Sequence, residues 1–535
     1  MTDSFTETIK TRLDRESAYR THLFCRSYLL TDAAVGDLDR YPFYGLWNSM
    51  ELHGYTLLTH PDTKFFCHQD GALSCVLIGH AYDPFLNEID ENKILRQILS
   101  SCRDSVPLFL EAIDQLTGVF VVFYFLKDRL IALQDCGGQK MLYYGFADGK
   151  LVITSIPQLA GDVFHLEWDP DVLRLLQTKG YYRGSGYLPG NRSPYRELTR
   201  LGANTWLSVK DGTAEISRLY PTAPREEFRT ETEKKAAIEE LYGIFHSNLA
   251  LAVRKWPRTA ISLTGGMDSK TSFACAAPFY DQLYCFSFSS KPSEDVDARA
   301  AAEICRRVGV PHHRYDIPEN PADIPDYEFQ RKIIEHNTSH LCKLHENEIR
   351  KYIYLRGRND FDVEIKSDMS EVGRAYFSRK YHGVRIPRII APRHLTITQG
   401  RYFLEPWAIR YADKCYASFM EQTGLKDDIC AYSMHDLAYW EVRMSSWAAT
   451  SFASQEYYHE ITIPYNNRRL LDLFLRFPLD DRLQDIPHRL LMQRGNPAVA
   501  AMDLAVKDSY FGKQRMLLET VYYYYATRLN TLGKK

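Results

Sequence analysis

The sequence predicts two regions of different fold class: an α+β antiparallel sandwich, then an α/β region with a parallel sheet and added helices. Three observations predict this. Short β-rich segments alternate with turns up to about residue 219. A strand, a Gly-rich loop, a helix and a second strand then follow one another over residues 259–289. From about Asp413 onward, helical patterns dominate.

The β-rich segments of the first half are rich in Val, Ile, Phe and Tyr, and Gly, Asp or Asn separate them. They are Thr21–Leu30, Ser74–Gly79, Val119–Leu126, Leu130–Gln134 and Leu151–Ser155. Asp148-Gly149, shortly before the last segment, is a favourable hairpin turn. We therefore expect mostly antiparallel pairing in this half.

A change in sequence character near residue 225 marks the predicted domain boundary. Residues 221–229 hold two prolines and a cluster of charges, which disfavour packing and predict a linker. We therefore expect one domain over residues 1–225 and a second over residues 226–535. Apolar residues at helical spacing predict that the second begins with an amphipathic helix at about Thr232–Lys255.

Composition limits the possible functions. The chain has 66 Lys and Arg against 68 Asp and Glu, a net charge of −2, so it lacks an overall basic field for nucleic acid or an anionic membrane. Its longest apolar run, Val119–Leu126, is too short to span a bilayer. The 11 cysteines form no CxxC pair and fit reduced thiols. We expect a cytoplasmic protein without nucleic-acid or membrane partners, and a homodimer is left open.

The segment most informative about chemistry is Thr264–Ser269 (TGGMDS), which follows the predicted strand Thr259–Leu263. Its adjacent glycines let the main chain approach a ligand closely. A helix that begins near Ser269 directs N–H groups and the positive end of its dipole at the loop, which suits phosphate. Asp268 adds a hard oxygen ligand for Mg²⁺. The alternative is a Gly-rich turn without function, in which Asp268 only caps the helix.

Three segments resemble landmarks of one family. Thr264–Ser269 resembles the SGGxDS pyrophosphate loop of N-type ATP pyrophosphatases, in particular asparagine synthetases, β-lactam synthetases and lasso-peptide cyclases. Val363–Glu371 is similar to the acidic GEGSDE segment of that family, although Lys366-Ser367 and Met369 depart from it. His459–Asn467 resembles its E-x-R-x-P-F-L-D segment. The resemblance covers roughly residues 226 to 500, and it implies an adenine-nucleotide α-hydrolase-like (PP-loop) fold.

The resemblance also implies cofactors and site residues. ATP and Mg²⁺ would activate a carboxylate as an acyl-adenylate, which then passes to ammonia or an amine. The implied nucleotide-binding residues are Leu263, Thr264, Gly265, Gly266, Met267, Asp268, Ser269, Lys270 and Ser287. The implied metal ligands are Asp268, Asp368 and Glu371. Asp368 and Glu371 are also the implied catalytic residues, with a late lysine for which the candidates are Lys507 and Lys513, and Arg494 as substitute. A solvated strand end is the alternative for the two acids.

The first half resembles the Ntn-type glutaminase domain of asparagine synthetases. Leu116–Phe120 and Gln134–Tyr144 are similar to a strand and a hairpin of that domain. A glutaminase of this class needs a cysteine directly after the initiator Met, whose own amine activates the thiol, and Thr2 stands there instead. Thr2 could serve as a nucleophile, but it lies in a polar, helix-prone leader. We therefore predict a degenerate glutaminase domain, with Cys25 as a strand or core thiol.

The sequence leaves three functions open. The first is an AMP-forming amide ligase whose carboxylate is aspartate, a sugar acid, or a natural-product or peptide acid. The second is a non-catalytic nucleotide-binding paralogue that acts as scaffold or regulator. The third is an asparagine synthetase that a partner supplies with ammonia.

Overall fold

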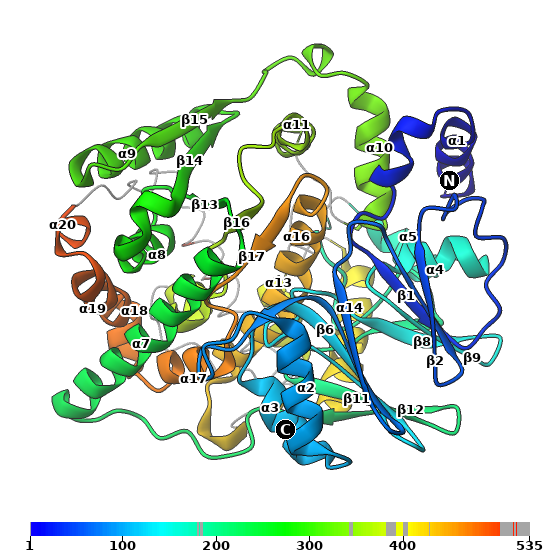
Figure 1. Ribbon diagram of the computed structural model, residues 1–535, viewed down its shortest axis with the longest axis horizontal. Coiled ribbons are helices and arrows are strands. Elements are labelled where there is room, and N and C mark those ends of the chain that lie inside the picture. The colour runs from blue at the N-terminus through cyan, green and yellow to red at the C-terminus, as the bar shows by residue number, and fades with distance from the viewer. Residues whose placement is uncertain are drawn as a thin grey trace.

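The computed structural model describes residues 2–178, 181, 186–341, 346–380, 392–399, 405–426, 429–502, 517 and 521. The first half holds two antiparallel sheets and the second half a parallel sheet, with helices around them (Figure 1). Both sheet types of the predicted fold class are therefore confirmed.

The two antiparallel sheets have six strands each. The first has the order β10-β8-β9-β1-β3-β2, with strands Leu198–Arg200, Tyr143–Ala147, Lys150–Thr154, Tyr28–Thr31, Tyr55–Thr59 and Asn48–Leu52. The second has the order β12-β11-β7-β6-β5-β4, with strands Thr213–Arg218, Thr205–Lys210, Leu130–Gln134, Thr117–Phe125, Leu73–Tyr82 and Phe65–Asp70. One apolar core joins Leu30 and Ile153 of the first sheet to Val121 and Phe123 of the second, so the sheets form a sandwich.

Helices cover the outer faces of this sandwich. Successive strand residues point to opposite faces, so Leu30 packs between the sheets while Leu29 packs in a second core with helices α1 and α4. A third core places α2 and α3 on the second sheet. The helices of this half are α1 (Thr2–Arg15), α2 (Glu91–Cys102), α3 (Val106–Asp114), α4 (Pro157–Phe164) and α5 (Pro170–Leu176).

The predicted hairpin turn at Asp148-Gly149 is confirmed. It joins β8 to β9, and Ala147 lies opposite Lys150. Asp148 and Gly149 have φ angles of 49° and 77°, the left-handed conformations that a two-residue hairpin turn requires. Asp and Gly tolerate such angles, which is why this pair of residues predicts the turn.

The predicted strand Thr21–Leu30 is wrong over most of its length. A 3-10 helix, η1 (Ser17–His22), and a turn come first, and β1 begins only at Tyr28. Phe24 and Arg26 have left-handed φ angles of 52° and 55°, which interrupt an extended chain. Cys25 is therefore a buried thiol of the turn and not of a strand.

The segment at 221–229 contains no helix or strand, as predicted, but it is packed. Arg225 donates its main-chain N–H to Cys430 O at 2.8 Å, and Phe228 is buried with its ring against Phe477. The expectation of an unpacked linker is therefore wrong, because one apolar side chain and main-chain hydrogen bonds hold the segment on the second half.

The second half is built on a five-stranded parallel sheet of order β15-β14-β13-β16-β17. The strands are β13 (Thr259–Ser262), β14 (Leu283–Ser289), β15 (His312–Asp316), β16 (Val363–Ile365) and β17 (Glu460–Thr462). The chain runs outward from β13 to β15 and then returns to the other side of β13 with β16. Open parallel sheets bind ligands outside the carboxyl ends of the strands at such a reversal. The topology therefore predicts a site between the ends of β13 and β16.

Helices surround this sheet, and α7 (Glu231–Lys255) confirms the predicted long helix. It begins with a capping box, in which Thr230 Oγ1 accepts from Glu233 N at 3.2 Å and Glu233 Oε2 accepts from Thr230 N at 2.8 Å. The other α-helices are α8 (Met267–Cys275), α9 (Pro292–Val308), α10 (Tyr327–Asn337), α11 (Glu346–Arg356), α12 (Tyr376–Lys380), α13 (Pro392–Gln399), α14 (Pro406–Thr423), α15 (Met434–Ala438), α16 (Ala449–Gln455), α17 (Arg468–Leu475), α18 (Leu479–Leu483), α19 (Ile486–Gly495) and α20 (Pro497–Ala500). Tyr439–Ala448 (η7) is a π-helix, and the short 3-10 helices are η2 (Ala277–Gln282), η3 (Pro321–Asp323), η4 (Ser370–Arg374) and η6 (Ile429–Ala431).

The segment after β17 ties the two halves together. The fully buried Asn466 donates from Nδ2 to Gly118 O and to Asp135 Oδ1, both at 2.7 Å, and its Oδ1 accepts from Gly137 N at 2.8 Å. The parallel sheet and the sandwich therefore share a hydrogen-bonded interface. Within the described residues, every helix is too short or too polar to cross a lipid bilayer.

Candidate functional site

The Gly-rich loop connects β13 to α8. Helix α8 begins at Met267, slightly before the predicted start, and Gly266 is its N-cap, with φ −70° and ψ 157° and no side-chain hydrogen bond at the cap. The N–H groups of the first helical turn have no acceptor within a helix. Together with the positive end of the helix dipole they form a site suited to phosphate.

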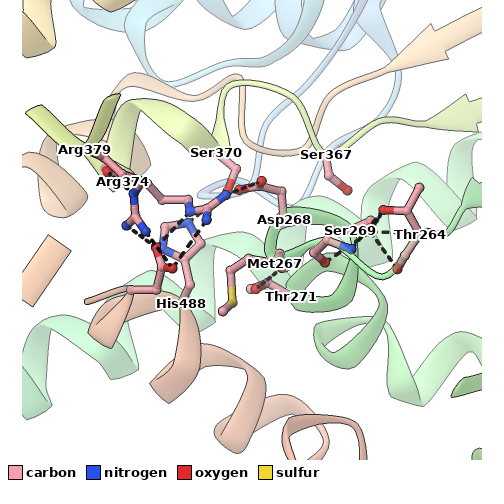
Figure 2. A network of polar contacts seen from close by, with 12 residues as sticks. Thr264, Met267, Asp268, Ser269, Thr271, Ser367, Ser370, Arg374, Arg379 and His488 are labelled. Atoms are coloured by element: carbon pink, nitrogen blue, oxygen red, sulfur yellow. Dashed lines mark hydrogen bonds and ion pairs between the residues drawn. The ribbon is translucent and has the colours of Figure 1, made fainter. Parts of the chain in front are cut away.

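Thr264 and Ser269 close the loop on itself. Ser269 Oγ accepts from Thr264 N at 3.2 Å and lies 2.8 Å from Thr264 Oγ1, which in turn accepts from Gly266 N at 3.1 Å. Gly265 N donates to Asp297 Oδ1 of α9 at 3.3 Å. Figure 2 shows Thr264 and Ser269 on one side of Asp268. These contacts fix the path of the main chain around the start of α8.

The acidic segment follows β16, which pairs directly with β13. Ser367 Oγ lies 2.7 Å from Ser272 Oγ of α8, so the segment rests against the helix. The ends of the two strands line one cavity of about 250 Å³, whose walls include Thr264, Asp268, Ser287, Asp297, Lys366 and Glu371. The structure thus brings the two sequence motifs together at the reversal of strand order.

Carboxylates dominate this cavity. Burial raises the pKa of Asp368 to about 6, Lys366 counteracts the shift and Asp268 adds to it. Burial also raises the pKa of Glu371 well above its usual value, and the charges of Asp268 and Asp368 raise it further. Among the described side chains, Asp268 Oδ1 and Glu371 Oε2 are buried oxygens without a hydrogen-bond partner. The site therefore concentrates negative charge that a cation would stabilise.

Arg374 and Arg379 approach Asp268 from the side opposite the loop (Figure 2). Arg374 Nη1 lies 2.5 Å from Asp268 Oδ2, and its Nε lies 2.8 Å from Asp485 Oδ1. Arg379 Nη2 also donates to Asp485 Oδ1, at 2.6 Å. Asp268 thus belongs to a chain of alternating charges that spans η4, α8 and the start of α19.

The negative charge of this site suits a divalent cation, although its described side chains are not arranged as a complete metal site. Among the described residues, no group of three or more His, Cys, Asp or Glu side chains is arranged to hold a metal ion. The unpartnered oxygens of Asp268 and Glu371 are nevertheless the hard donors that Mg²⁺ prefers. Mg²⁺ in nucleotide sites is usually bound by one or two carboxylates together with phosphate oxygens. Asp268 and Glu371 could supply the carboxylates of such a site.

The other predicted residues take varied positions. Leu263, Gly266, Ser269 and Asp368 also line the cavity, whereas Gly265, Met267 and Lys270 belong to the same loop and helix. Lys270 is buried, with Nζ 3.5 Å from Met502 O. Ser287 Oγ donates to Leu263 O at 2.8 Å, which ties β14 to the loop. Arg494 pairs with Glu239 of α7 at 3.1 Å. Lys507 and Lys513 lie outside the described residues.

Three charged residues of the cavity did not emerge as site candidates from the sequence motifs. Lys366 stood out only as a departure from the family pattern, and Glu294 and Asp297 lie on α9, away from any motif. Lys366 directly follows β16, which pairs with β13, and no local pattern in the sequence predicts that pairing. In the first half, Thr2 is the first residue of α1, as its helix-prone surroundings predict.

Comparisons of the chain with known protein families and with curated proteins give no match. Solved structures show a distant likeness. Glutamine phosphoribosylpyrophosphate amidotransferase from B. subtilis, in complex with ADP and GMP, is 10% identical with a TM-score of 0.22, over 68% of this chain and 73% of that chain. A structure described as the allosteric regulatory enzyme of purine biosynthesis is 10% identical with a TM-score of 0.24, over 61% and 89% of the two chains. At such TM-scores, neither likeness bears on the activity of this chain.

Proposed function

We propose that this chain is an ATP-dependent ligase that forms amide bonds, similar to asparagine synthetases. One observation carries the proposal. The Thr264–Ser269 loop and the segment after β16 end neighbouring parallel strands at the reversal of strand order, and they line one cavity. The same observation supports a PP-loop-like fold for the second half.

In the proposed reaction, an oxygen of the substrate carboxylate attacks the α-phosphorus of ATP. The bond from that phosphorus to the bridging oxygen breaks, pyrophosphate leaves, and an acyl-adenylate forms. Ammonia or an amine then attacks the acyl carbon, AMP leaves, and the amide remains. In this reaction, main-chain N–H groups of the loop and of the first turn of α8 hold the negative charge of the pyrophosphate.

Mg²⁺ would be held by Asp268, together with Asp368 or Glu371 and phosphate oxygens. When bound, the ion supplies positive charge for the leaving pyrophosphate. Asp268 Oδ1 and Glu371 Oε2 support this assignment, because both are buried acceptors without partners among the described residues. Asp268 Oδ2 keeps its contact with Arg374, so a single carboxylate could serve both cations.

For the first half we propose a degenerate Ntn-like glutaminase domain without glutaminase activity. Thr2 opens helix α1 and stands where the family has a cysteine. The ligase would then use free ammonia, ammonia from a partner protein, or an amine. Aspartate, a sugar acid and a peptide acid remain the candidate carboxylates.

Exchange of labelled pyrophosphate into ATP, measured with a panel of these carboxylates, tests the proposal. One carboxylate should stimulate the exchange with Mg²⁺ present, and glutamine should release no glutamate. A chain that binds Mg·ATP but gives no exchange with any carboxylate would be the non-catalytic paralogue. The ion pair of Arg374 with Asp268 favours this second function, because it engages one oxygen of the proposed metal ligand. A chain that binds no Mg·ATP contradicts both functions.

A further inference from the structure

Lys366 has a defined position at the cavity. Its main-chain N–H donates to Thr462 O at 2.9 Å, which extends the pairing of β16 with β17 and fixes the start of the side chain. The side chain is 12% exposed and lines the same cavity as Thr264, Gly266 and Ser269 of the Gly-rich loop. The proposed function puts the phosphates in this cavity.

The charges of the cavity give this lysine a specific importance. Among the described residues that line the cavity, the acidic ones are Asp268, Glu294, Asp297, Asp368 and Glu371, and the basic one is Lys366. A triphosphate brings further negative charge into these surroundings. Such binding is unfavourable unless cations accompany it, because charge repulsion is weakly screened in a partly buried site.

The ammonium group of Lys366 is held by a buried ion pair. Lys366 Nζ lies 2.6 Å from Glu364 Oε1, and Glu364 Oε2 lies 2.6 Å from His459 Nε2. Glu364 is fully buried, and His459 nearly so. The ion pair gives the flexible lysine side chain a fixed position. It also stabilises Glu364, because a buried carboxylate without a partner would be strongly unfavourable. An ammonium has three N–H donors, and an ion pair with one carboxylate oxygen leaves donors for a phosphate oxygen.

We propose that Lys366, positioned by Glu364 and His459, is the phosphate-binding cation of this site. The proposal rests on the proposed nucleotide-dependent function. It assigns to the end of β16 the positive charge that the family resemblance expects from a late lysine. The competing explanation is that Lys366 only neutralises Glu364 and contributes to folding, without contact to a ligand.

Calorimetric titration of Mg·ATP and of adenosine distinguishes the two explanations. Lys366→Met should weaken Mg·ATP binding at least tenfold, the usual effect of losing a charge-assisted hydrogen bond, and leave adenosine binding unchanged. Lys366→Arg keeps the positive charge and should restore most of the affinity. Lys140→Met is the matched control: the Lys140 side chain is 5% exposed and pairs with Glu456 at 2.9 Å in another part of the molecule. It should lower stability without changing nucleotide affinity.

The outcomes separate this inference from the proposed function. If the wild type binds no Mg·ATP, the proposed function fails and this inference with it. If the wild type binds and Lys366→Met binds equally well, only this inference is overturned. Should Lys366→Met fail to fold, the double variant Lys366→Gln/Glu364→Gln removes both charges of the pair together. Its Mg·ATP affinity then decides in the same way, with a tenfold loss expected and an unchanged affinity as the contrary result.

Discussion

Arg374 Nη1 lies 2.5 Å from Asp268 Oδ2, which joins the Gly-rich loop to η4. Arg374 is held in turn by Asp485, so its guanidinium has two anionic partners. Asp268 therefore meets a protein cation on one oxygen, while its other oxygen is buried without a partner among the described residues. The second oxygen is the one we assign to Mg²⁺.

Asp268→Asn should abolish most of the proposed activity. The substitution keeps the size of the side chain but removes the charge that both Arg374 and Mg²⁺ would bind. We expect carboxylate-dependent pyrophosphate exchange to fall by about 100-fold, as when one main electrostatic contact to a transition state is lost. Asp128→Asn, in an exposed turn of the first half, is the control and should keep full exchange. Unchanged exchange in Asp268→Asn would contradict the assigned role.

Removal of divalent cations should abolish nucleotide binding. Asp268, Asp368 and Glu371 repel a triphosphate, and the raised pKa values of the last two report how unfavourable negative charge already is there. We expect titration of ATP in excess EDTA to give no detectable binding, and added Mg²⁺ to restore it. Equal ATP affinity with and without Mg²⁺ would rule out a metal role for these carboxylates.

Gly495→Ala and Gly243→Ala should change stability in opposite directions. A Cβ on Gly495 would lie 2.7 Å from Ala274 O, so α19 would have to move away from α8, at a cost of roughly 1–3 kcal/mol. Gly243 lies within α7 with open space around it, and alanine there should stabilise by about 0.5–1 kcal/mol. Urea unfolding of both variants checks this, and a stability change of the same sign in both would refute it.

Stability should decrease on acidification in part because of His22. Its Nε2 accepts from Arg356 Nε at 3.0 Å, and burial, with the charge of Arg356 adding to it, lowers the pKa of His22 to about 3. In the unfolded chain, the His22 imidazole takes up a proton near pH 6.5, whereas in the folded chain it stays neutral down to about pH 3. The contribution of His22 to the free energy of unfolding is therefore complete above pH 6.5 and is lost as the pH falls toward 3. In urea unfolding between pH 7 and 4.5, the free energy of unfolding should fall less steeply with decreasing pH in His22→Gln than in the wild type, by up to about 1.4 kcal/mol per pH unit. An identical slope in both proteins would exclude this role.

Thr2→Cys should not create a glutaminase. Residue 2 opens α1, and the first strand of the sandwich begins only at Tyr28, so a cysteine there would not lie at a strand end. We expect no glutamate release from glutamine by this variant, measured beside the wild type. Release by the variant would show that the first half keeps a working glutaminase site.

Local patterns predicted the elements whose conformation depends on their own residues. Leu130–Gln134 is a strand with the predicted bounds, and Leu283–Ser289 is the second strand of the unit predicted over residues 259–289, since apolar β-formers occupy both segments. The turn before β1 escaped prediction because Phe24 donates its N–H to Asn337 Oδ1 at 2.6 Å. That partner lies far away in the sequence, and no local pattern contains it.

Residue types within a few positions predict the Gly-rich loop, the helix behind it and the acidic segment, so the local sequence is enough for these elements. The pairing of β16 with β13, the place of Lys366 in the same cavity as the loop, and the contact of Arg374 with Asp268 depend on the folded chain. Strand order and long-range ion pairs follow from the burial of whole faces against one another, and that sum is spread over the entire chain.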